Sequence, residues 1–166
     1  MYFALRDGRD EDFETLWSID QQCFAPGIAY SQRELQTYIR RRDAFTLVAE
    51  RRPPGGGDLE QGQIPEIIAF LVAEAYRRQG HIITIDVLPS ARRAGVGSSL
   101  LTAAEDRLRL GGCRSVYLET AVDNGDALIF YKQHGYFLNE VVPGYYSNGV
   151  DALVLEKDLL SAAQAS

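Results

Sequence analysis

The chain is poor in cysteine and in basic residues, and it has no long apolar run. Its two cysteines, Cys23 and Cys113, lack the spacing of a metal site or a disulfide framework, so we expect buried free thiols and no bound metal. There are 17 lysines and arginines against 23 aspartates and glutamates, a formal net charge of −6 at pH 7. This acidic balance argues against nucleic acid as the main partner, because a phosphate backbone is usually bound by a basic face.

Signals for membrane insertion and export are also missing. The longest apolar run, residues 67–73, is too short to span a bilayer, and the first residues lack the apolar core of a signal peptide. We therefore expect a cytoplasmic protein with no membrane partner.

The composition is that of an ordinary globular protein. The 166 residues are 46% hydrophobic and 24% charged, which suits a single domain over residues 1–166 with a substantial core. A glycine-rich polar stretch at residues 51–66 is expected to be a mobile hairpin loop inside this domain.

Hydrophobic periodicity and turn residues predict a mixed α/β fold. Asp10 is expected to cap the first helix, and Ser31 with Glu34 has the spacing of a capping box at the second. Strands are predicted at residues 2–5, 45–50, 67–76, 81–88, 115–120, 136–142 and 152–156, and helices at 10–23, 31–39, 97–110 and 124–133. The second half therefore reads as alternating strands and helices.

A glycine loop at residues 92–97, Arg-Arg-Ala-Gly-Val-Gly, follows an apolar strand pattern and leads into a helical one. The first amides of a helix have no intrahelical partner, and the helix dipole places partial positive charge there. Gly95 and Gly97 lack a Cβ, so a phosphate can approach the main chain, and Arg92 and Arg93 add charge beside it. The loop predicts a ligand that carries a diphosphate.

Two common nucleotide sites do not fit this loop. A dinucleotide fingerprint needs a third glycine where Ser99 and Leu100 stand, and a P-loop needs Gly-Lys-Ser/Thr at the helix start. A plain tight turn with a helix cap remains an alternative interpretation.

Residues 87–101 resemble motif A of the GNAT superfamily, the acetyl-CoA-dependent N-acetyltransferases, with its Gln/Arg-x-x-Gly-x-Gly/Ala signature at 92–97. Residues 116–136 resemble motif B of that family. The resemblance implies a GNAT fold, an α/β (α+β) architecture with a mixed, mostly antiparallel twisted sheet flanked by helices. It also implies a splayed β-α-β cofactor cleft, acetyl-CoA as cosubstrate, and direct acetyl transfer in a ternary complex.

The resemblance further implies how the cofactor is held. Amides of residues 93–98 would bind the pyrophosphate, and backbone groups at Ile85 and Val87 would pair with the pantetheine arm. Asn124 would hydrogen-bond the pantetheine, cap the following helix, or do both. The implied cofactor-binding residues are Ile85, Val87, Arg92, Arg93, Ala94, Gly95, Val96, Gly97, Ser98, Asn124 and Tyr131.

Three residues are candidates for proton transfer. By the resemblance Tyr131 is the acid that protonates the leaving thiolate, and its alternative role is core packing. Glu119 ends an apolar strand and is the candidate base, its alternative being a solvated strand-end carboxylate. His81 is the rival base because its ordinary pKa suits proton transfer, and its alternative is plain surface. Glu119 and His81 together could also hold a relaying water.

The acceptor is indicated by residues 145–152, which resemble the Tyr-Tyr-x-x-Gly-x-Asp-Ala segment of RimI-type protein N-terminal acetyltransferases. In those relatives this segment faces an early loop, here residues 24–30, across the peptide channel. Val150 departs from their pattern, where Glu is usual. The implied substrate-binding residues are Phe24, Tyr30, Glu119, Tyr145 and Tyr146.

We therefore expect an N-acetyltransferase that acts on a protein or peptide N-terminus as a monomer or homodimer. The alternatives left open are a small-molecule acceptor such as a polyamine, an antibiotic or an amino acid, and a non-catalytic sensor of acyl-CoA. Tyr145 and Tyr146 can alternatively be aromatics that stabilise a hairpin.

Overall fold

A single seven-stranded sheet runs through the computed structural model, which describes residues 1–160. Residues 161–166, the end of the predicted domain, lie outside the described residues. The spatial order is β1-β2-β3-β4-β5-β7-β6, and the neighbours are antiparallel except for β4 and β5. The strands are β1 (Tyr2–Asp7), β2 (Ala44–Arg52), β3 (Ile67–Tyr76), β4 (Gln79–Val87), β5 (Ser115–Ala121), β6 (Phe137–Val142) and β7 (Ala152–Asp158).

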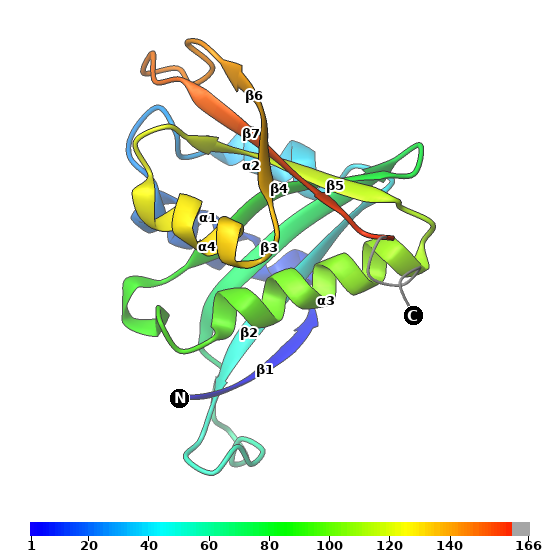
Figure 1. The fold of residues 1–166 in the computed structure, drawn as a ribbon. Coiled ribbons are helices and arrows are strands. Elements are labelled where there is room, and N and C mark those ends of the chain that lie inside the picture. Colours follow the sequence, from blue (N-terminus) through cyan, green and yellow to red (C-terminus); the bar gives the residue numbers. More distant parts are fainter. Residues whose placement is uncertain (161–166) are drawn as a thin grey trace.

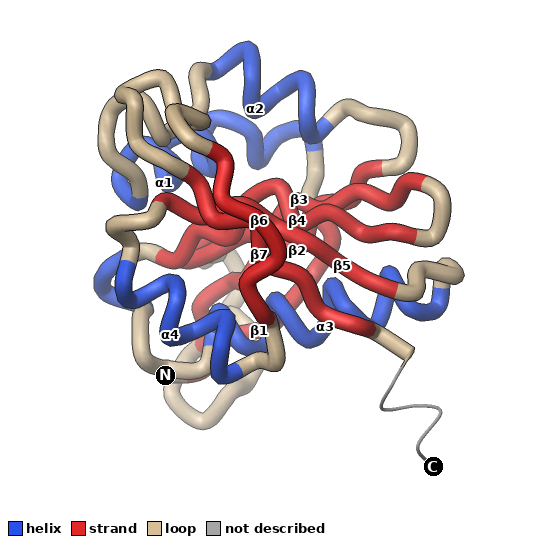
Figure 2. The backbone as a smooth tube through the Cα atoms, turned by 45° about the horizontal axis from the view of Figure 1, so that its top comes forward, coloured by secondary structure: helices blue, strands red, loops and turns tan. Residues whose placement is uncertain are grey.

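Helices cover both faces of the sheet, as Figure 2 shows, with α1 and α2 on one side and α3 and α4 on the other. Two short 3₁₀ turns, η1 and η2, precede α1 and α3. The bounds are η1 (Asp10–Asp12), α1 (Phe13–Cys23), α2 (Gln32–Ile39), η2 (Pro89–Ala91), α3 (Val96–Leu110) and α4 (Gly125–Gln133). This architecture confirms the predicted fold class.

Strand β3 separates two apolar cores. Phe70 and Val72 pack with α1 and α2, whereas Leu71 and Ala73 belong to the core that includes α3. All four side chains are fully buried. A strand covered on both faces reads as a continuous apolar run, which is why residues 67–76 were recognisable as a strand.

The start of α1 differs from the prediction. Asp10 does not cap a helix; it opens the 3₁₀ turn η1, and α1 begins only at Phe13. The carboxylate that organises this region is that of Asp12, which accepts from Arg9 N at 2.7 Å and from both terminal nitrogens of Arg6 at 2.8 and 2.9 Å. Because Arg6 lies on β1, a tertiary contact fixes where the helix begins.

At α2 the capping box is confirmed. Ser31 Oγ accepts from the Glu34 amide at 3.1 Å, and the Glu34 carboxylate accepts from the Ser31 amide at 3.0 Å. These bonds satisfy two amides that a helix start leaves without partners.

Strands β4 and β5 form the parallel pair, and they stay paired only at their beginnings. Residues 79–81 of β4 pair with 115–117 of β5, after which the two strands diverge. Figure 1 shows β5, β7 and β6 swinging away from β4 beyond this point. A register shift between β3 and β4 at Val72/Ala73 adds a bulge beside the divergence. The facing edges of β4 and β5 are therefore open to a ligand.

Residues 53–66 connect β2 and β3, which pair antiparallel. The mobility expected of this connection stays a prediction. No helix within residues 1–160 is both long and apolar enough to cross a bilayer.

The ion pair between Arg6 and Asp12 generates a stability prediction. The hydrogen bonds from Arg6 hold the pKa of the Asp12 carboxyl below its ordinary value. The folded state therefore binds fewer protons here than the unfolded state, so the stabilisation is present above the ordinary aspartate pKa and is lost as pH falls through the lowered pKa. Asp12→Asn should reduce the free energy of unfolding by about 2 kcal/mol at neutral pH, and this difference should vanish in acid.

Denaturant unfolding of wild type and variant across pH measures this difference. Asp10→Asn is the matched control, because Asp10 is an exposed acid on the same turn. An equal loss in both variants would contradict the role of Asp12.

Candidate active site

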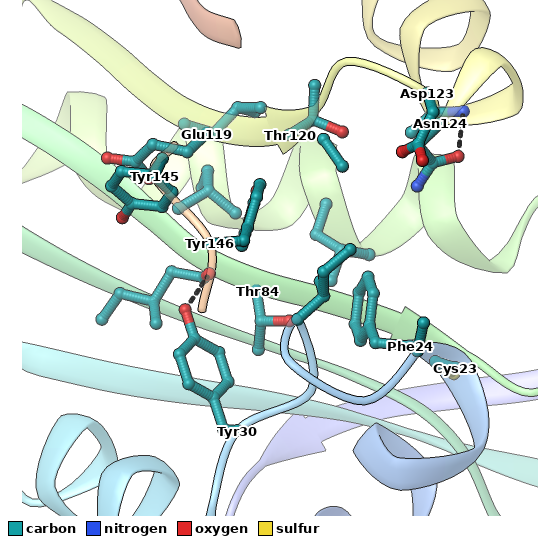
Figure 3. Close-up of a pocket in the computed structure, with 18 of the residues that line it drawn as sticks. Cys23, Phe24, Tyr30, Thr84, Glu119, Thr120, Asp123, Asn124, Tyr145 and Tyr146 are labelled. Atoms are coloured by element: carbon teal, nitrogen blue, oxygen red, sulfur yellow. Dashed lines mark hydrogen bonds between the residues drawn. The ribbon is translucent and has the colours of Figure 1, made fainter. Parts of the chain in front are cut away.

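A cavity of about 440 Å³ fills the opening between β4 and β5. Its walls are residues 82–85 of β4, 118–121 of β5, the segment between α1 and α2, and the segment between β6 and β7. Figure 3 shows Glu119 and Tyr145 at one end of it and Asn124 toward the other. A second cavity of about 260 Å³ shares Asn124 and Tyr131 with the first and reaches Gly97. Together they make one cleft that runs toward the glycine loop.

The glycine loop places the first turn of α3 at the far end of this cleft. Gly95 has a left-handed backbone, with φ of 82°, and nothing lies within 4 Å of where a Cβ would stand. The Ser99 amide bonds Gly95 O at 3.0 Å as the first turn of the helix closes, so the amides before it remain as donors for an anion. Val96 is buried at 1% exposure and packs in the core, so its side chain anchors the start of α3.

The two arginines of the loop behave differently. Arg92 folds back, and its Nε donates to the Val87 carbonyl at 3.0 Å. Arg93 is exposed and has a left-handed backbone with φ of 63°, a conformation that is uncommon outside glycine. Both side chains therefore flank the loop, and one of them binds the strand position that was expected to pair with the cofactor. Ala94 and Ser98 are half-buried in the same turn.

Asn124 caps α4 and lines both cavities. Its Oδ1 accepts from the Ala127 amide at 3.2 Å, as a helix cap does. The amide nitrogen of its side chain is not used by that bond, and the residue lines both cavities. Capping and ligand binding are compatible at this position.

Tyr131 lies on α4 between the two cavities. Its ring makes edge contacts with Phe130, at 5.2 Å between centroids, and with Tyr136, at 5.6 Å. Burial raises the pKa of the phenol well above its ordinary value, and the negative charge of Asp86 adds to this effect. Tyr131 therefore keeps its proton at neutral pH and can act as a donor in the cleft.

Glu119 and His81, predicted as rival bases, are in direct contact. His81 Nε2 lies 2.7 Å from Glu119 Oε2, and the imidazole stacks on Tyr117 with ring centroids 4.3 Å apart. His81 and Tyr117 are the last paired residues before β4 and β5 diverge, so the contact sits at the apex of the opening. On the other side of the ring, His81 Nδ1 is 3.6 Å from Glu74. Glu119 lines the cavity, and His81 lies behind it.

Two segments close over the cavity, as the resemblance implied. Ser147 Oγ, between β6 and β7, donates to the Gly27 carbonyl, between α1 and α2, at 2.9 Å. Tyr30 donates its hydroxyl to the Ile83 carbonyl of β4 at 3.3 Å, which fixes its ring in the cavity wall (Figure 3). Phe24 lines the wall beside it.

Tyr145 and Tyr146 both border this cavity and pack edge to face, with centroids 5.0 Å apart. Burial raises the pKa of Tyr145 to about 12, and it raises that of Tyr146 further. Both phenols are therefore neutral hydrogen-bonding groups at ordinary pH. Tyr145 remains 48% exposed, which leaves its ring available at the mouth of the cavity.

The cysteines are free thiols, and Cys113 is buried, but the expectation that Cys23 is buried is wrong. Cys23 is half-buried because it ends α1 at the edge of the cleft, where Sγ donates to the Val87 carbonyl at 3.4 Å. Burial raises the pKa of its thiol to about 11, so it is protonated at neutral pH. Within residues 1–160 no cluster of histidine, cysteine and carboxylate side chains is arranged to hold a metal ion.

Two buried carboxyl groups lie beneath the cavity, and the sequence analysis did not predict them as a pair. Asp20 of α1 and Asp86 of β4 have no exposed surface, and burial raises the pKa of each. A signal existed, because Asp20 shares the buried helical stripe of Leu16 and Ile19, and Asp86 interrupts an apolar strand.

Comparison with known proteins agrees with this geometry. An N-alpha-acetyltransferase from Sulfurisphaera tokodaii is 35% identical over 83 residues, which are 49% of this chain and 50% of that protein, so the chain spans about half the length of such a curated relative. The structure of Ard1 from Thermoplasma volcanium superposes with a TM-score of 0.79 at 25% identity, covering 95% of this chain and 98% of that one. The ribosomal-protein-S18-alanine N-acetyltransferase from Escherichia coli shares the fold, with a TM-score of 0.77 at 19% identity over 95% and 94% of the two chains.

A family model described as "Acetyltransferase (GNAT) family" matches residues 13–136, a stretch that includes the glycine loop, the β4–β5 opening and Tyr131. The chain belongs to the GNAT family of acetyltransferases.

Proposed function

We propose that this protein transfers the acetyl group of acetyl-CoA to the α-amine of a protein or peptide N-terminus. The observation that carries the proposal is the placing of Glu119, backed by His81, in a cavity that is bridged by the 24–30 and 143–151 segments. Those segments present tyrosines, which bind a peptide backbone with little loss of side-chain entropy. The N-alpha-acetyltransferase relatives support the same acceptor.

The cleft fits acetyl-CoA as donor. Its far end offers the free amides of the first turn of α3 and the open space over Gly95, where a phosphate can approach the backbone. Beyond His81, β4 has an edge that β5 does not pair, so Ile85 and Val87 can bond an extended arm as a neighbouring strand would. Asn124 and Tyr131 border this path.

The chemistry follows from the residues that meet in the cavity. Glu119 accepts a proton from the acceptor ammonium, and His81 holds the carboxylate in place through its 2.7 Å contact. The freed amine nitrogen attacks the thioester carbonyl carbon and loses its second proton to solvent, so the neutral amide C–N bond forms as the C–S bond breaks. Tyr131 donates its phenolic proton toward the departing thiolate, and solvent restores that proton. Cys23 and Cys113 have raised thiol pKa values, which favours direct transfer without an acyl-cysteine.

Acceptor identity is tested by release of free CoA thiol with acetyl-CoA and a panel of peptides, polyamines, aminoglycosides and amino acids. We expect turnover with peptides that carry a free α-amine and none with the same peptides after N-terminal blocking. Turnover with small amines alone would identify a small molecule as the acceptor and leave the proposed mechanism unchanged. Acetyl-CoA binding without turnover on any acceptor would favour the sensor.

The proton-transfer roles predict specific kinetic losses. Glu119→Gln and Tyr131→Phe remove a base and an acid, so each should lower kcat by about 10²- to 10⁴-fold and leave acetyl-CoA affinity nearly unchanged. Glu140→Gln is the control, because Glu140 is an exposed carboxylate on β6 outside the cleft. Full turnover by both cavity variants would remove Glu119 and Tyr131 from the mechanism.

The glycine loop predicts a loss of donor affinity. Gly95→Ala places a methyl group over the free amides and strains a left-handed backbone, so the KM for acetyl-CoA should rise about tenfold with little change in acceptor KM. Gly112→Ala is a close control, because Gly112 follows the other end of α3 with φ of +96° and equally open space. It should lower stability to a similar extent and leave both KM values alone. Equal KM changes in the two variants would show that backbone strain, and not the phosphate site, is responsible.

A further inference from the structure

Asp20 and Asp86 meet between α1 and β4, directly beneath the 24–30 segment. Asp20 Oδ2 accepts from the Tyr30 amide at 2.7 Å, and Asp86 Oδ1 accepts from the Thr84 hydroxyl. Each carboxyl group then has one oxygen left, Asp20 Oδ1 and Asp86 Oδ2, and both are buried without another hydrogen-bond partner among the described residues. The two side chains are near enough to hydrogen-bond one another when a proton is present.

The side chains that face the pair directly are apolar, neutral or acidic. The ionisable groups that act on them include Glu34 and Tyr30, which face Asp20, Tyr131, which faces Asp86, and Cys23, which faces both. The guanidinium of Arg92 lies against Cys23 and donates to the Val87 carbonyl, and it does not hydrogen-bond the free oxygen of either carboxyl group. Two adjacent carboxylates in such a place would repel one another and lose their hydration, so one proton between them is the favourable state.

Asp20 also holds both ends of the segment that faces the acceptor. Its backbone carbonyl accepts from the Phe24 amide at 3.2 Å, and its side chain accepts from the Tyr30 amide. Asp86 lies on β4 between Ile85 and Val87, the two positions assigned to the donor. A bond from Asp20 to Asp86 would therefore join the acceptor-facing segment to the strand that lines the donor cleft.

We propose that Asp20 and Asp86 share one proton, and that the resulting hydrogen bond is a clamp that positions residues 24–30 for the acceptor. The two aspartates are positioning residues and touch neither substrate. The effect on the acceptor rests on the proposed function, whereas the shared proton and the order of the segment do not.

The shared proton can be detected on well-folded protein by infrared spectroscopy at neutral pH. Wild type should show the carbonyl stretch of one buried, protonated carboxyl group. Asp20→Asn and Asp86→Asn should each abolish it, because the amide supplies the bridging hydrogen and the remaining partner becomes a carboxylate. Absence of this band from wild type, or its persistence in both variants, would overturn the proposal.

The orientation of the clamp gives a sharper test with amide variants. In Asp86→Asn, Thr84 holds the amide oxygen, so the nitrogen faces Asp20 and donates to it. In Asp20→Asn, the Tyr30 amide holds the oxygen, so the nitrogen faces Asp86. Each single variant therefore keeps the bridge. The double variant Asp20→Asn/Asp86→Asn sets two amino groups against each other and breaks it.

The rate of hydrogen exchange at the Tyr30 amide reports whether the clamp is formed, and it can be measured without any substrate. Exchange should be slow in wild type and in both single variants, and about tenfold faster in the double variant. With a peptide acceptor, the double variant should raise the acceptor KM about tenfold while kcat and the KM for acetyl-CoA change little.

These outcomes separate the clamp from simpler explanations. Two charged carboxylates in wild type would make the double variant the most ordered of the four proteins, which contradicts the clamp. A purely structural role would change all kinetic constants together, which also contradicts it. If no acceptor is found, the proposed function fails while infrared and Tyr30 exchange still decide the clamp. If the double variant does not fold, the infrared comparison of the single variants decides it.

Discussion

The separation of β4 from β5 after only a few paired residues is the constraint on which the site depends. Backbone groups inside a fold need hydrogen-bond partners, and here the neighbouring strand withdraws just where the cavity begins. The β4 edge is left ready to pair with an extended ligand. The stacked rings of His81 and Tyr117 close the apex of the opening. The contact from His81 holds Glu119 at the point where the opening begins. The cleft proposed for acetyl-CoA and the cavity proposed for the acceptor thus both follow from the early divergence of β4 and β5.

Local patterns in the sequence predicted most of the elements. Residues 67–76 form the predicted strand because an unbroken apolar run must be covered on both faces. Ser31 and Glu34 form the capping box that their spacing predicted, each side chain accepting from the other residue's amide. The prediction failed at Asp10, because Arg6 on the preceding strand β1 binds Asp12 and so decides where the helix begins. A contact of this kind follows neither a capping spacing nor a helical period, so the residue pattern did not reveal it.

The candidate site was predictable as a set of residues but not as an arrangement. The glycine loop, Asn124 and Tyr131 are recognisable from motifs, which describe short stretches of chain. The contact between His81 and Glu119 depends on the register of two parallel strands joined through α3, and such a register is set by packing. The pairing of Asp20 with Asp86 was missed for a related reason, since each looks like an isolated acid until α1 lies on β4.

Residues 24–30 and 143–151 approach each other closely at Gly27, and this approach requires a residue without a Cβ. Gly27 has a left-handed backbone with φ of +89°, and a Cβ there would lie 2.7 Å from the Cβ of Asn148. Any larger residue would push the 143–151 segment outward and separate the Ser147 hydroxyl from the Gly27 carbonyl. The spacing of these two segments is therefore set by the main chain at Gly27.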